Sequence, residues 1–298
     1  EISIKGSKNA ALPIMVSALL SEKTLKLKNI PKLDDIKNMS KLLLSYGSII
    51  KTSSDNIEIN CKKIINKDAD YDIVRKMRAS ILILGPLLAR FGKAKISLPG
   101  GCAIGTRPID IHLEGLKRLG ANFTVENGYV VGDVNNQLIG NNIKLPFPSV
   151  GATENIMMAA VRAKGKTIIE NAAKEPEILD LANSLNKMGS KINITNKGVI
   201  KITGVKKLNK SNYKIMSDRI VAGTFVIAAV MLNKKFEVKE IQTKHLKALT
   251  SVLKDMGANI KIKENSISIF PTVSLNGIKI QTSPYPGFPT DLQAQMMA

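Results

Sequence analysis

The stretch Leu253-Lys254-Asp255-Met256-Gly257-Ala258 closes a helical pattern with a glycine, and the same arrangement occurs four times in the chain. In each copy an amphipathic helical pattern leads to a glycine and a small residue, and two short alternating strand patterns follow. A glycine here is typical of the residue just after a helix C-terminus. The other three copies are Leu42-Leu43-Leu44-Ser45-Tyr46-Gly47-Ser48, Leu116-Lys117-Arg118-Leu119-Gly120-Ala121 and Leu185-Asn186-Lys187-Met188-Gly189-Ser190.

These glycines recur at intervals of roughly 70 residues, which is the spacing of a repeated supersecondary unit. Each unit reads as helix, strand, helix, strand, strand, so we expect an α/β fold of βαβαββ-like units with mixed sheets packed around helices. A polar helix start precedes each copy, and a fifth start, Pro289-Thr290-Asp291-Leu292, lies just before Ala298. Together with the strand-like beginning at Glu1, this predicts a native protein that extends beyond both ends of the sequence.

The composition is that of a globular protein that works in a reducing compartment. Of the 298 residues, 44% are hydrophobic and 23% charged, and no apolar run is long enough to span a bilayer. Two cysteines cannot build a disulfide framework, which predicts a cytoplasmic location. With two histidines and no Cys-x-x-Cys motif, we predict neither a metal site nor another cofactor.

The net charge of +20 allows two interpretations. A nucleic-acid partner is one of them. The other is a lysine-rich composition spread along the whole chain, and we favour it because the basic residues form no block. Aromatic residues, which a single-strand binder needs as stacking platforms, make up only 4% of the chain. We therefore predict no nucleic-acid partner, although a positive field would still favour small anionic substrates.

The second unit contains an enlarged glycine-rich segment. Between the mid-unit strand and the glycine it covers 23 positions, against 19 or 20 in the other copies. The extra length falls in Leu98-Pro99-Gly100-Gly101-Cys102-Ala103-Ile104-Gly105-Thr106-Arg107-Pro108. A solvent-reachable Cys102 near Arg107 could have a tuned thiol pKa and act as an acid or nucleophile. From spacing alone, a small buried apolar role for Cys102 is equally open, whereas Cys61 at the end of a strand pattern is expected to be structural.

Several polar residues lie at the expected helix starts, where free backbone N–H groups attract phosphate and carboxylate. Lys8, Asn9 and Arg78 are at or near two of these starts, and Asp291 is at a third. The alternatives are solvated surface charges for Lys8 and Arg78 and a helix-capping carboxylate for Asp291. His112 and His245 are expected to be packing or surface residues rather than ligands.

Seven motifs in order along the chain resemble the UDP-N-acetylglucosamine 1-carboxyvinyltransferase family of enolpyruvyl transferases. The Pro-Gly-Gly-Cys segment at 99–102, followed by Gly-x-Arg-Pro at 105–108, is the most specific of them. The others are Gly6-Ser7-Lys8-Asn9-Ala10-Ala11-Leu12-Pro13, Met77-Arg78-Ala79-Ser80, Gly151-Ala152-Thr153, Glu170-Asn171-Ala172-Ala173, Asp218-Arg219-Ile220 and Phe288-Pro289-Thr290-Asp291-Leu292-Gln293-Ala294-Gln295.

The resemblance implies an inside-out α/β barrel fold with two similar domains of three units each. Residues 8–216 would form the first domain, which carries the Cys102 segment. Residues 1–7 and 217–298 would form an incomplete second domain, because the family's final portion is not in this sequence. The substrates would bind in the cleft between the domains, and the oligomeric state is left open.

The resemblance also implies a reaction and its residues. The family transfers the enolpyruvyl group of phosphoenolpyruvate to the 3-hydroxyl of UDP-N-acetylglucosamine by addition and elimination of phosphate. This is the first committed step of peptidoglycan precursor synthesis, on which cell-wall biogenesis, cell shape, the cell cycle and cell division depend. Cys102 would protonate the enolpyruvyl methylene and be the target of fosfomycin, Asp291 would act as a base, and Lys8 would join them in catalysis.

The same resemblance assigns the binding residues. Those expected to bind phosphoenolpyruvate are Lys8, Asn9 and Arg107. Those expected to bind the UDP-sugar are Arg78, Arg107, Pro108, Ile109, Asp110, Ile111, Phe147, Pro148, Ser149, Val150 and Asp291. Two rivals remain: the sister transferase acting on shikimate 3-phosphate, which lacks the Cys102 motif, and a non-catalytic anion- or nucleic-acid-binding protein on the same scaffold.

Overall fold

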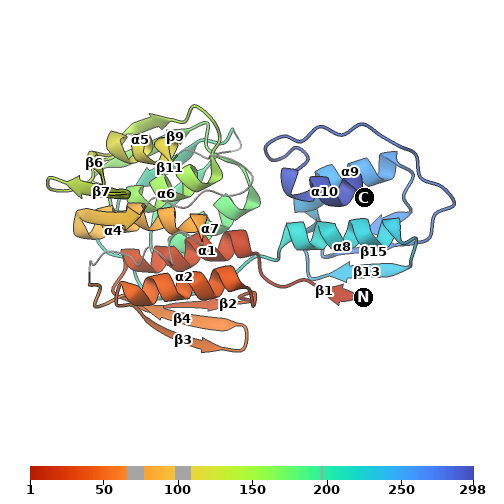
Figure 1. The fold of residues 1–298 in the computed structure, drawn as a ribbon, viewed down its shortest axis with the longest axis horizontal. Coiled ribbons are helices and arrows are strands. Elements are labelled where there is room, and N and C mark those ends of the chain that lie inside the picture. The colour runs from red at the N-terminus through yellow and green to blue at the C-terminus, as the bar shows by residue number, and fades with distance from the viewer. Residues whose placement is uncertain (66–76, 98–108, 196) are drawn as a thin grey trace. The chain divides into compact units, whose positions relative to one another are not determined.

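The structure is a computed structural model that describes residues 1–65, 77–97, 109–195 and 197–298. The chain divides into two compact units. Unit 1 comprises Glu1–Ser7, Lys174–Pro176 and Met216–Ala298, and unit 2 comprises Lys8–Ala173 and Glu177–Ile215. Figure 1 shows the helices and strands of both units.

Unit 2 contains three sheets. Two have four strands, and each of these joins one parallel pair, β12–β2 or β8–β9, to antiparallel neighbours. In spatial order the first sheet consists of β12 (Ser211–Lys214), β2 (Leu25–Lys28), β4 (Asn56–Asn60) and β3 (Ile49–Ser53). The second consists of β5 (Lys93–Ser97), β7 (Tyr129–Val134) and β6 (Ala121–Glu126). The third consists of β10 (Lys191–Ile194), β11 (Ile200–Thr203), β9 (Lys166–Glu170) and β8 (Asn142–Lys144).

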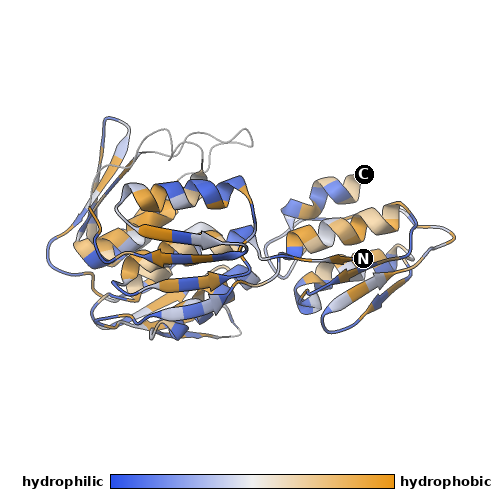
Figure 2. Ribbon diagram, turned by 90° about the horizontal axis from the view of Figure 1, so that it is seen from below, coloured by the Kyte–Doolittle hydropathy of each residue, from blue (hydrophilic) through white to orange (hydrophobic). Residues whose placement is uncertain are grey.

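The helices formed by the described residues of unit 2 are of two kinds, which alternate along the chain. Those that begin each repeat are apolar and largely buried: α1 (Lys8–Ser17) with η1 (Ala18–Leu20), η2 (Arg78–Ile83) with α4 (Leu84–Phe91), and α6 (Val150–Ala160). Those that follow are amphipathic and bury one face: α2 (Asp34–Ser45), α5 (Asp110–Arg118) and α7 (Pro176–Lys187). Figure 2 shows this difference as mostly orange helices beside helices with one orange and one blue side.

The repeated glycines have the conformation that the sequence pattern predicts. Gly47, Gly120, Gly189 and Gly257 have φ values of 92°, 97°, 101° and 91°, the left-handed region in which a side chain would be strained. Each follows the end of a helix, as expected for a C′ glycine. The predicted hairpin turn Asn127-Gly128 is also confirmed, since it joins β6 to β7 with φ values of 50° and 78°.

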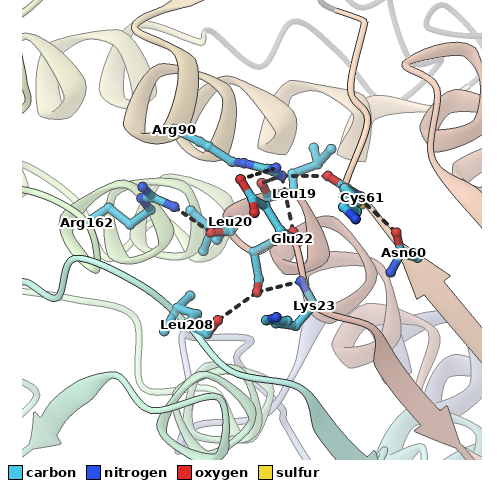
Figure 3. A network of polar contacts seen from close by, with 11 residues as sticks. Leu19, Leu20, Glu22, Lys23, Asn60, Cys61, Arg90, Arg162 and Leu208 are labelled. Carbon is cyan, nitrogen blue, oxygen red and sulfur yellow. Dashed lines mark hydrogen bonds and ion pairs between the residues drawn. The ribbon is translucent and has the colours of Figure 1, made fainter.

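Two arginines form a buried polar network beneath the end of α1 and η1 (Figure 3). Nη1 of Arg90 lies 2.9, 3.1 and 2.8 Å from the carbonyl oxygens of Leu19, Ser21 and Cys61. Nη1 of Arg162 donates to the carbonyl of Leu20 at 2.9 Å. The bonds to Leu19, Leu20 and Ser21 satisfy carbonyl groups at the end of η1, and the bond to Cys61 ties this end to the segment that follows β4. Burial is the main reason why the pKa of both guanidinium groups is lowered.

Unit 1 is built around one four-stranded sheet. Its strands lie in the order β1 (Ile2–Ser3), β13 (Phe236–Lys239), β15 (Ser266–Ile269) and β14 (Ile260–Ile262). The short first strand pairs in parallel with β13, and Ile4 is buried in the same core. The helical elements of this unit are α8 (Arg219–Met231), η3 (Thr243–Leu246), α9 (Lys247–Asp255), η4 (Thr290–Leu292) and α10 (Gln293–Met297).

The expected α/β fold with mixed sheets and helices is confirmed. The strand-like beginning at Glu1 is confirmed as β1, which pairs in parallel with β13. The short strands β8 and β12 were not located from the sequence, and they pair in parallel with β9 and β2. Over the described residues, no helix has the length and apolar character needed to cross a membrane.

Candidate functional site

Some of the predicted site residues fall where the structure gives no description. Cys102, Arg107 and Pro108 lie outside the described residues. Arg78 is the first residue of η2, but its side chain is likewise outside the described part. The predicted residues that can be located are Lys8, Asn9, Ile109, Asp110, Ile111, Phe147, Pro148, Ser149 and Val150 in unit 2, and Asp291 in unit 1.

Lys8 and Asn9 are the first two residues of α1, as predicted. Nζ of Lys8 forms a 2.9 Å ion pair with Oδ2 of Asp35 near the start of α2, and the two side chains are 38% and 35% exposed. Lys8 is therefore a paired cation at the positive end of a helix rather than an isolated surface charge. Asn9 is exposed beside it. An anion at this helix start would meet both the positive end of the helix dipole and the Lys8 ammonium.

The segment 147–150 forms the start of α6. Ser149 is the N-cap, and its Oγ accepts a hydrogen bond from the backbone N–H of Ala152 at 3.4 Å. The hydroxyl of Thr153 donates to the carbonyl of Ser149 at 2.7 Å and accepts from the N–H of Ala173 at 3.1 Å. These bonds fix the helix start, while Phe147 just before it is 54% exposed. An exposed aromatic ring next to a rigid helix start can pack against a planar ligand.

The start of α5 opens into a cavity of about 580 Å³. Asp110 and Ile111 line it, and so do Lys144 to Pro146, which immediately precede Phe147. The cavity has the size of a small-molecule site. It is lined by one of the segments that the sequence analysis assigned to the UDP-sugar and by the residues that precede the other. Sequence reasoning missed the cations of its wall, Lys117, Arg118 and Lys144. The signal for Lys117 and Arg118 was the basic last turn of α5, which also suits a helix C-terminus, and Lys144 in β8 had no such signal.

Asp291 lies exposed in η4 of unit 1. The helix start at this point is Pro289, and among the described residues none caps it through a side chain. The alternative of a capping carboxylate for Asp291 is therefore not seen. Pro289 and Leu292 line a second cavity, of about 50 Å³, together with Arg219, His245 and Tyr285.

This small cavity has a cationic wall. The guanidinium of Arg219 lies 5.7 Å from the centre of the Tyr285 ring, within cation–π range. Burial, and then the positive charges of Lys244 and Arg219, lower the pKa of His245 to about 4. His245 is therefore neutral at pH 7.

Cys61 has the environment of a structural cysteine, as predicted. It is fully buried, with its Sγ 3.3 Å from Oγ of Ser48. Burial raises the pKa of the Cys61 thiol to about 11, and this outweighs the opposing effects of Ser48 and Arg90. The thiolate, which is the reactive form, is therefore scarce at neutral pH.

The described residues contain no group of three or more His, Cys, Asp or Glu side chains that could hold a metal ion. The charged side chains that line the larger cavity are the cations Lys117, Arg118 and Lys144 and the carboxylates Asp110 and Glu114, and the smaller cavity is lined by Arg219, Lys244 and Lys247. Such a set suits the recognition of phosphate and carboxylate groups by direct charge contacts.

Comparison with known proteins places the whole chain in one family. The family EPSP synthase (3-phosphoshikimate 1-carboxyvinyltransferase) matches residues 1–298. A UDP-N-acetylglucosamine 1-carboxyvinyltransferase of Pelagibacter ubique is 50% identical over 297 residues, which are 100% of this chain and 71% of that protein. The enzyme of the same name from Geotalea uraniireducens is 47% identical over 298 residues, with the same coverage of 100% and 71%.

Solved structures agree with this fold. The enolpyruvyl transferase NikO from Streptomyces tendae superposes with a TM-score of 0.88 at 16% identity, over 99% of this chain and 71% of that one. EPSP synthase from Acinetobacter baumannii superposes with a TM-score of 0.72 at 20% identity, over 93% of this chain and 65% of that one. At such identities the likeness concerns the fold alone, which is the α/β fold of the enolpyruvyl transferases.

Proposed function

Because the chain belongs to the EPSP synthase family, and within it to the UDP-N-acetylglucosamine 1-carboxyvinyltransferases, we infer that it is an enolpyruvyl transferase. Its reaction moves the enolpyruvyl group of phosphoenolpyruvate to UDP-N-acetylglucosamine and serves peptidoglycan precursor synthesis. The observation that carries this conclusion is the identity of 50% and 47% to two such enzymes over the whole chain. The family also sets aside the rival of a non-catalytic nucleic-acid-binding protein.

We further propose the finer features of the architecture. Residues 8–216 form one domain of three repeat units, and residues 1–7 with 217–298 belong to a second domain of an inside-out α/β barrel fold. The repeated glycines and the repeated alternation of buried and amphipathic helices support this proposal. A cytoplasmic location follows from the reaction, because both substrates are charged metabolites made inside the cell.

The proposed phosphoenolpyruvate site consists of Lys8, Asn9 and Arg107. The start of α1 supports it, because the Lys8 ammonium and the positive end of the helix dipole favour an anion. The ion pair with Asp35 keeps the ammonium at this helix start. These cations would offset the charge that develops on the phosphate as it leaves.

The proposed UDP-sugar site consists of Arg78, Arg107–Ile111, Phe147–Val150 and Asp291. The cavity that Asp110 and Ile111 share with Lys144 to Pro146 supports the middle part of this assignment. Lys117, Arg118 and Lys144 would attract the diphosphate of the nucleotide through their field. Phe147 supplies an exposed ring for contact with a planar base.

The proposed chemistry is an addition followed by an elimination. Cys102 delivers a proton to the methylene carbon of phosphoenolpyruvate, and the sugar 3-hydroxyl attacks the neighbouring carbon as Asp291 takes its proton. The tetrahedral adduct then loses phosphate, and the new methyl group returns a proton to Cys102. The product is an enolpyruvyl ether. Asp291 suits its role in being exposed and free of a capping contact.

The test measures phosphate release by the intact protein. We expect release only when both phosphoenolpyruvate and UDP-N-acetylglucosamine are present, and none when shikimate 3-phosphate replaces the sugar nucleotide. Intact-mass analysis should show fosfomycin labelling that is increased by UDP-N-acetylglucosamine and lost in Cys102→Ala. Release with shikimate 3-phosphate, or no release with either acceptor by a folded protein, would overturn the assignment.

A further inference from the structure

One buried carboxamide links three elements of unit 2. Asn155 on α6 is fully buried, and its Nδ2 donates to the carbonyl of Ile81 at 3.0 Å. Its Oδ1 accepts from the backbone N–H of Gly85 at 2.7 Å. Ile81 and Gly85 are four residues apart, so in a regular α-helix they would bond to each other. The Asn155 side chain thus bridges the junction at which η2 passes into α4, a place where an inserted side chain redirects a helix.

The hydrogen bonds of Asn155 also fix the state of His112 on α5. The Gly85 N–H can only donate, so the amide oxygen must face it and Nδ2 must face the other way. Nδ2 carries two protons, and besides Ile81 it lies 3.2 Å from Nδ1 of His112. Nδ1 must accept, because an amide nitrogen only donates. The ring proton of a neutral His112 is therefore on Nε2.

The contacts around this amide are close. A Cβ on Gly85 would lie 2.4 Å from the carbonyl oxygen and 2.5 Å from Oδ1 of Asn155, so only glycine fits there. A Cβ on Gly151, in the first turn of α6, would lie 3.1 Å from Cε1 of His112. α6 therefore packs against η2–α4 on one side and against the His112 ring on the other. A shift of Asn155 or His112 would be transmitted to both neighbours.

The elements joined in this way carry the residues proposed to bind the UDP-sugar. Arg78 is the first residue of η2, Asp110 and Ile111 begin α5, and Val150 begins α6. We propose that Asn155 and His112 are positioning residues of the sugar-nucleotide site, holding η2 and α5 in register with the start of α6. This inference rests on the proposed function. Neither residue needs to touch the substrate, since each acts through the element it holds.

The hydrogen-bond arrangement is tested first, without any substrate. The chain contains only two histidines, so ring ¹⁵N–¹H correlation spectra with His245→Gln as reference assign His112 directly. We expect the Nε2–H tautomer at pH 7.5 in the wild-type protein. In Asn155→Asp the carboxylate cannot donate, and we expect a proton on Nδ1 instead. A wild-type His112 protonated on Nδ1, or a tautomer unchanged in Asn155→Asp, would overturn the arrangement.

Kinetics then separate positioning from simple stability. With the intact protein, we expect Asn155→Asp and His112→Leu to raise the KM for UDP-N-acetylglucosamine about tenfold and to change the KM for phosphoenolpyruvate less than about twofold. His112→Asn keeps an acceptor near the position of Nδ1 and should restore most of the affinity. If Asn155→Asp does not fold, the two KM values of His112→Leu are compared with those of His112→Asn instead.

A matched control lies on α7. Asn186 bridges the N–H and the carbonyl of Ile192, both at 2.8 Å, in the same way but away from the proposed site residues. Asn186→Asp should lower the melting temperature without separating the two KM values. Calorimetry of wild-type protein with UDP-N-acetylglucosamine is run first, because an absence of binding there contradicts the proposed function and not the role of Asn155. Equal changes in both KM values for Asn155→Asp and His112→Leu, as for Asn186→Asp, would overturn the proposal.

Discussion

Nη1 of Arg90 on α4 donates a 2.8 Å hydrogen bond to the carbonyl oxygen of Cys61, which follows β4. The same nitrogen also donates to the carbonyls of Leu19 and Ser21 at the end of η1. One side chain of the second repeat therefore bonds to two segments of the first. Only 7% of the Arg90 side chain is exposed, whereas its ion-pair neighbour Glu22, at 3.8 Å, is 69% exposed. The carbonyl bonds, rather than the ion pair, are therefore the main stabilising contacts of Arg90.

The first prediction concerns this network. Arg90→Lys keeps the charge but loses the planar fork that spans separate carbonyls, and we expect it to lower the free energy of unfolding by about 1–3 kcal/mol. Native-state hydrogen exchange of η1 and α4 amides measures the effect within unit 2. Arg162→Lys is the control, since Arg162 donates to a single carbonyl and should be affected less. An equal loss in both variants would contradict the importance of the shared nitrogen.

The second prediction concerns pH and unit 1. The folded-state pKa of His245 is lowered to about 4, below its ordinary value of 6.5, so the unfolded chain binds the extra proton first. The neutral, buried His245 contributes its full stability above pH 6.5, and this contribution is lost as the pH falls towards 4. Allowing for the partial exposure of the ring, we expect unit 1 to lose about 1–2 kcal/mol between pH 7 and pH 4.5 on this account.

His245→Gln removes this titration. On acidification the variant should therefore lose less stability than the wild-type protein does. Thermal unfolding followed by circular dichroism at pH 7 and pH 4.5 measures it. If the variant and the wild-type protein lose the same stability between the two pH values, His245 is not desolvated in the folded state.

The third prediction concerns thiol reactivity. With a pKa of about 11, Cys61 is ionised in roughly one molecule in a thousand at pH 8, and it is also buried. In a Cys102→Ala background, a disulfide reagent should therefore react with Cys61 roughly a hundredfold more slowly than with a free thiol, or more slowly still, because so little of the Cys61 thiol is ionised. In guanidinium chloride the same thiol should react at once. Rapid reaction in the folded protein would contradict the structural role of Cys61.

The fourth prediction concerns the cap of α8. Oδ1 of Asp218 accepts hydrogen bonds from the N–H groups of Ile220 and Val221 at 2.9 and 3.0 Å. Asp218→Ala should destabilise unit 1 by about 1–2 kcal/mol, while Asp218→Asn, which keeps the acceptor, should lose less. The chain has no tryptophan, so urea unfolding is best followed by circular dichroism. If the two variants are equally destabilised, the carboxylate acts through its charge and not through the cap.

The sequence predicted those parts of the fold that depend on local backbone requirements. Gly120 and its counterparts could be found because a left-handed residue after a helix strongly favours glycine. The strand β12 could not, because its segment Ser-Asn-Tyr-Lys has no apolar alternation and its partner β2 lies near the other end of unit 2. Its pairing is decided by the packed unit and not by local preference.

The same distinction applies to the candidate site. Lys8 and Asn9 could be placed at a helix start because polar residues before an apolar run mark such starts. The bridging role of Asn155 could not be foreseen, since two of its partners are backbone groups of Ile81 and Gly85. Backbone donors and acceptors are the same at nearly every residue, so they leave no signal in the sequence.

The parallel pairing of β1 with β13 also sets an order of events during synthesis. Ile2 leaves the ribosome before its neighbour Val238, which is made 236 residues later. At the usual rate of translation this interval is on the order of ten to fifty seconds. Unit 2, which ends at Ile215, can be completed first, while the strand that precedes it stays unpaired until unit 1 emerges. A nascent chain of this protein therefore exposes an early segment that a chaperone can bind.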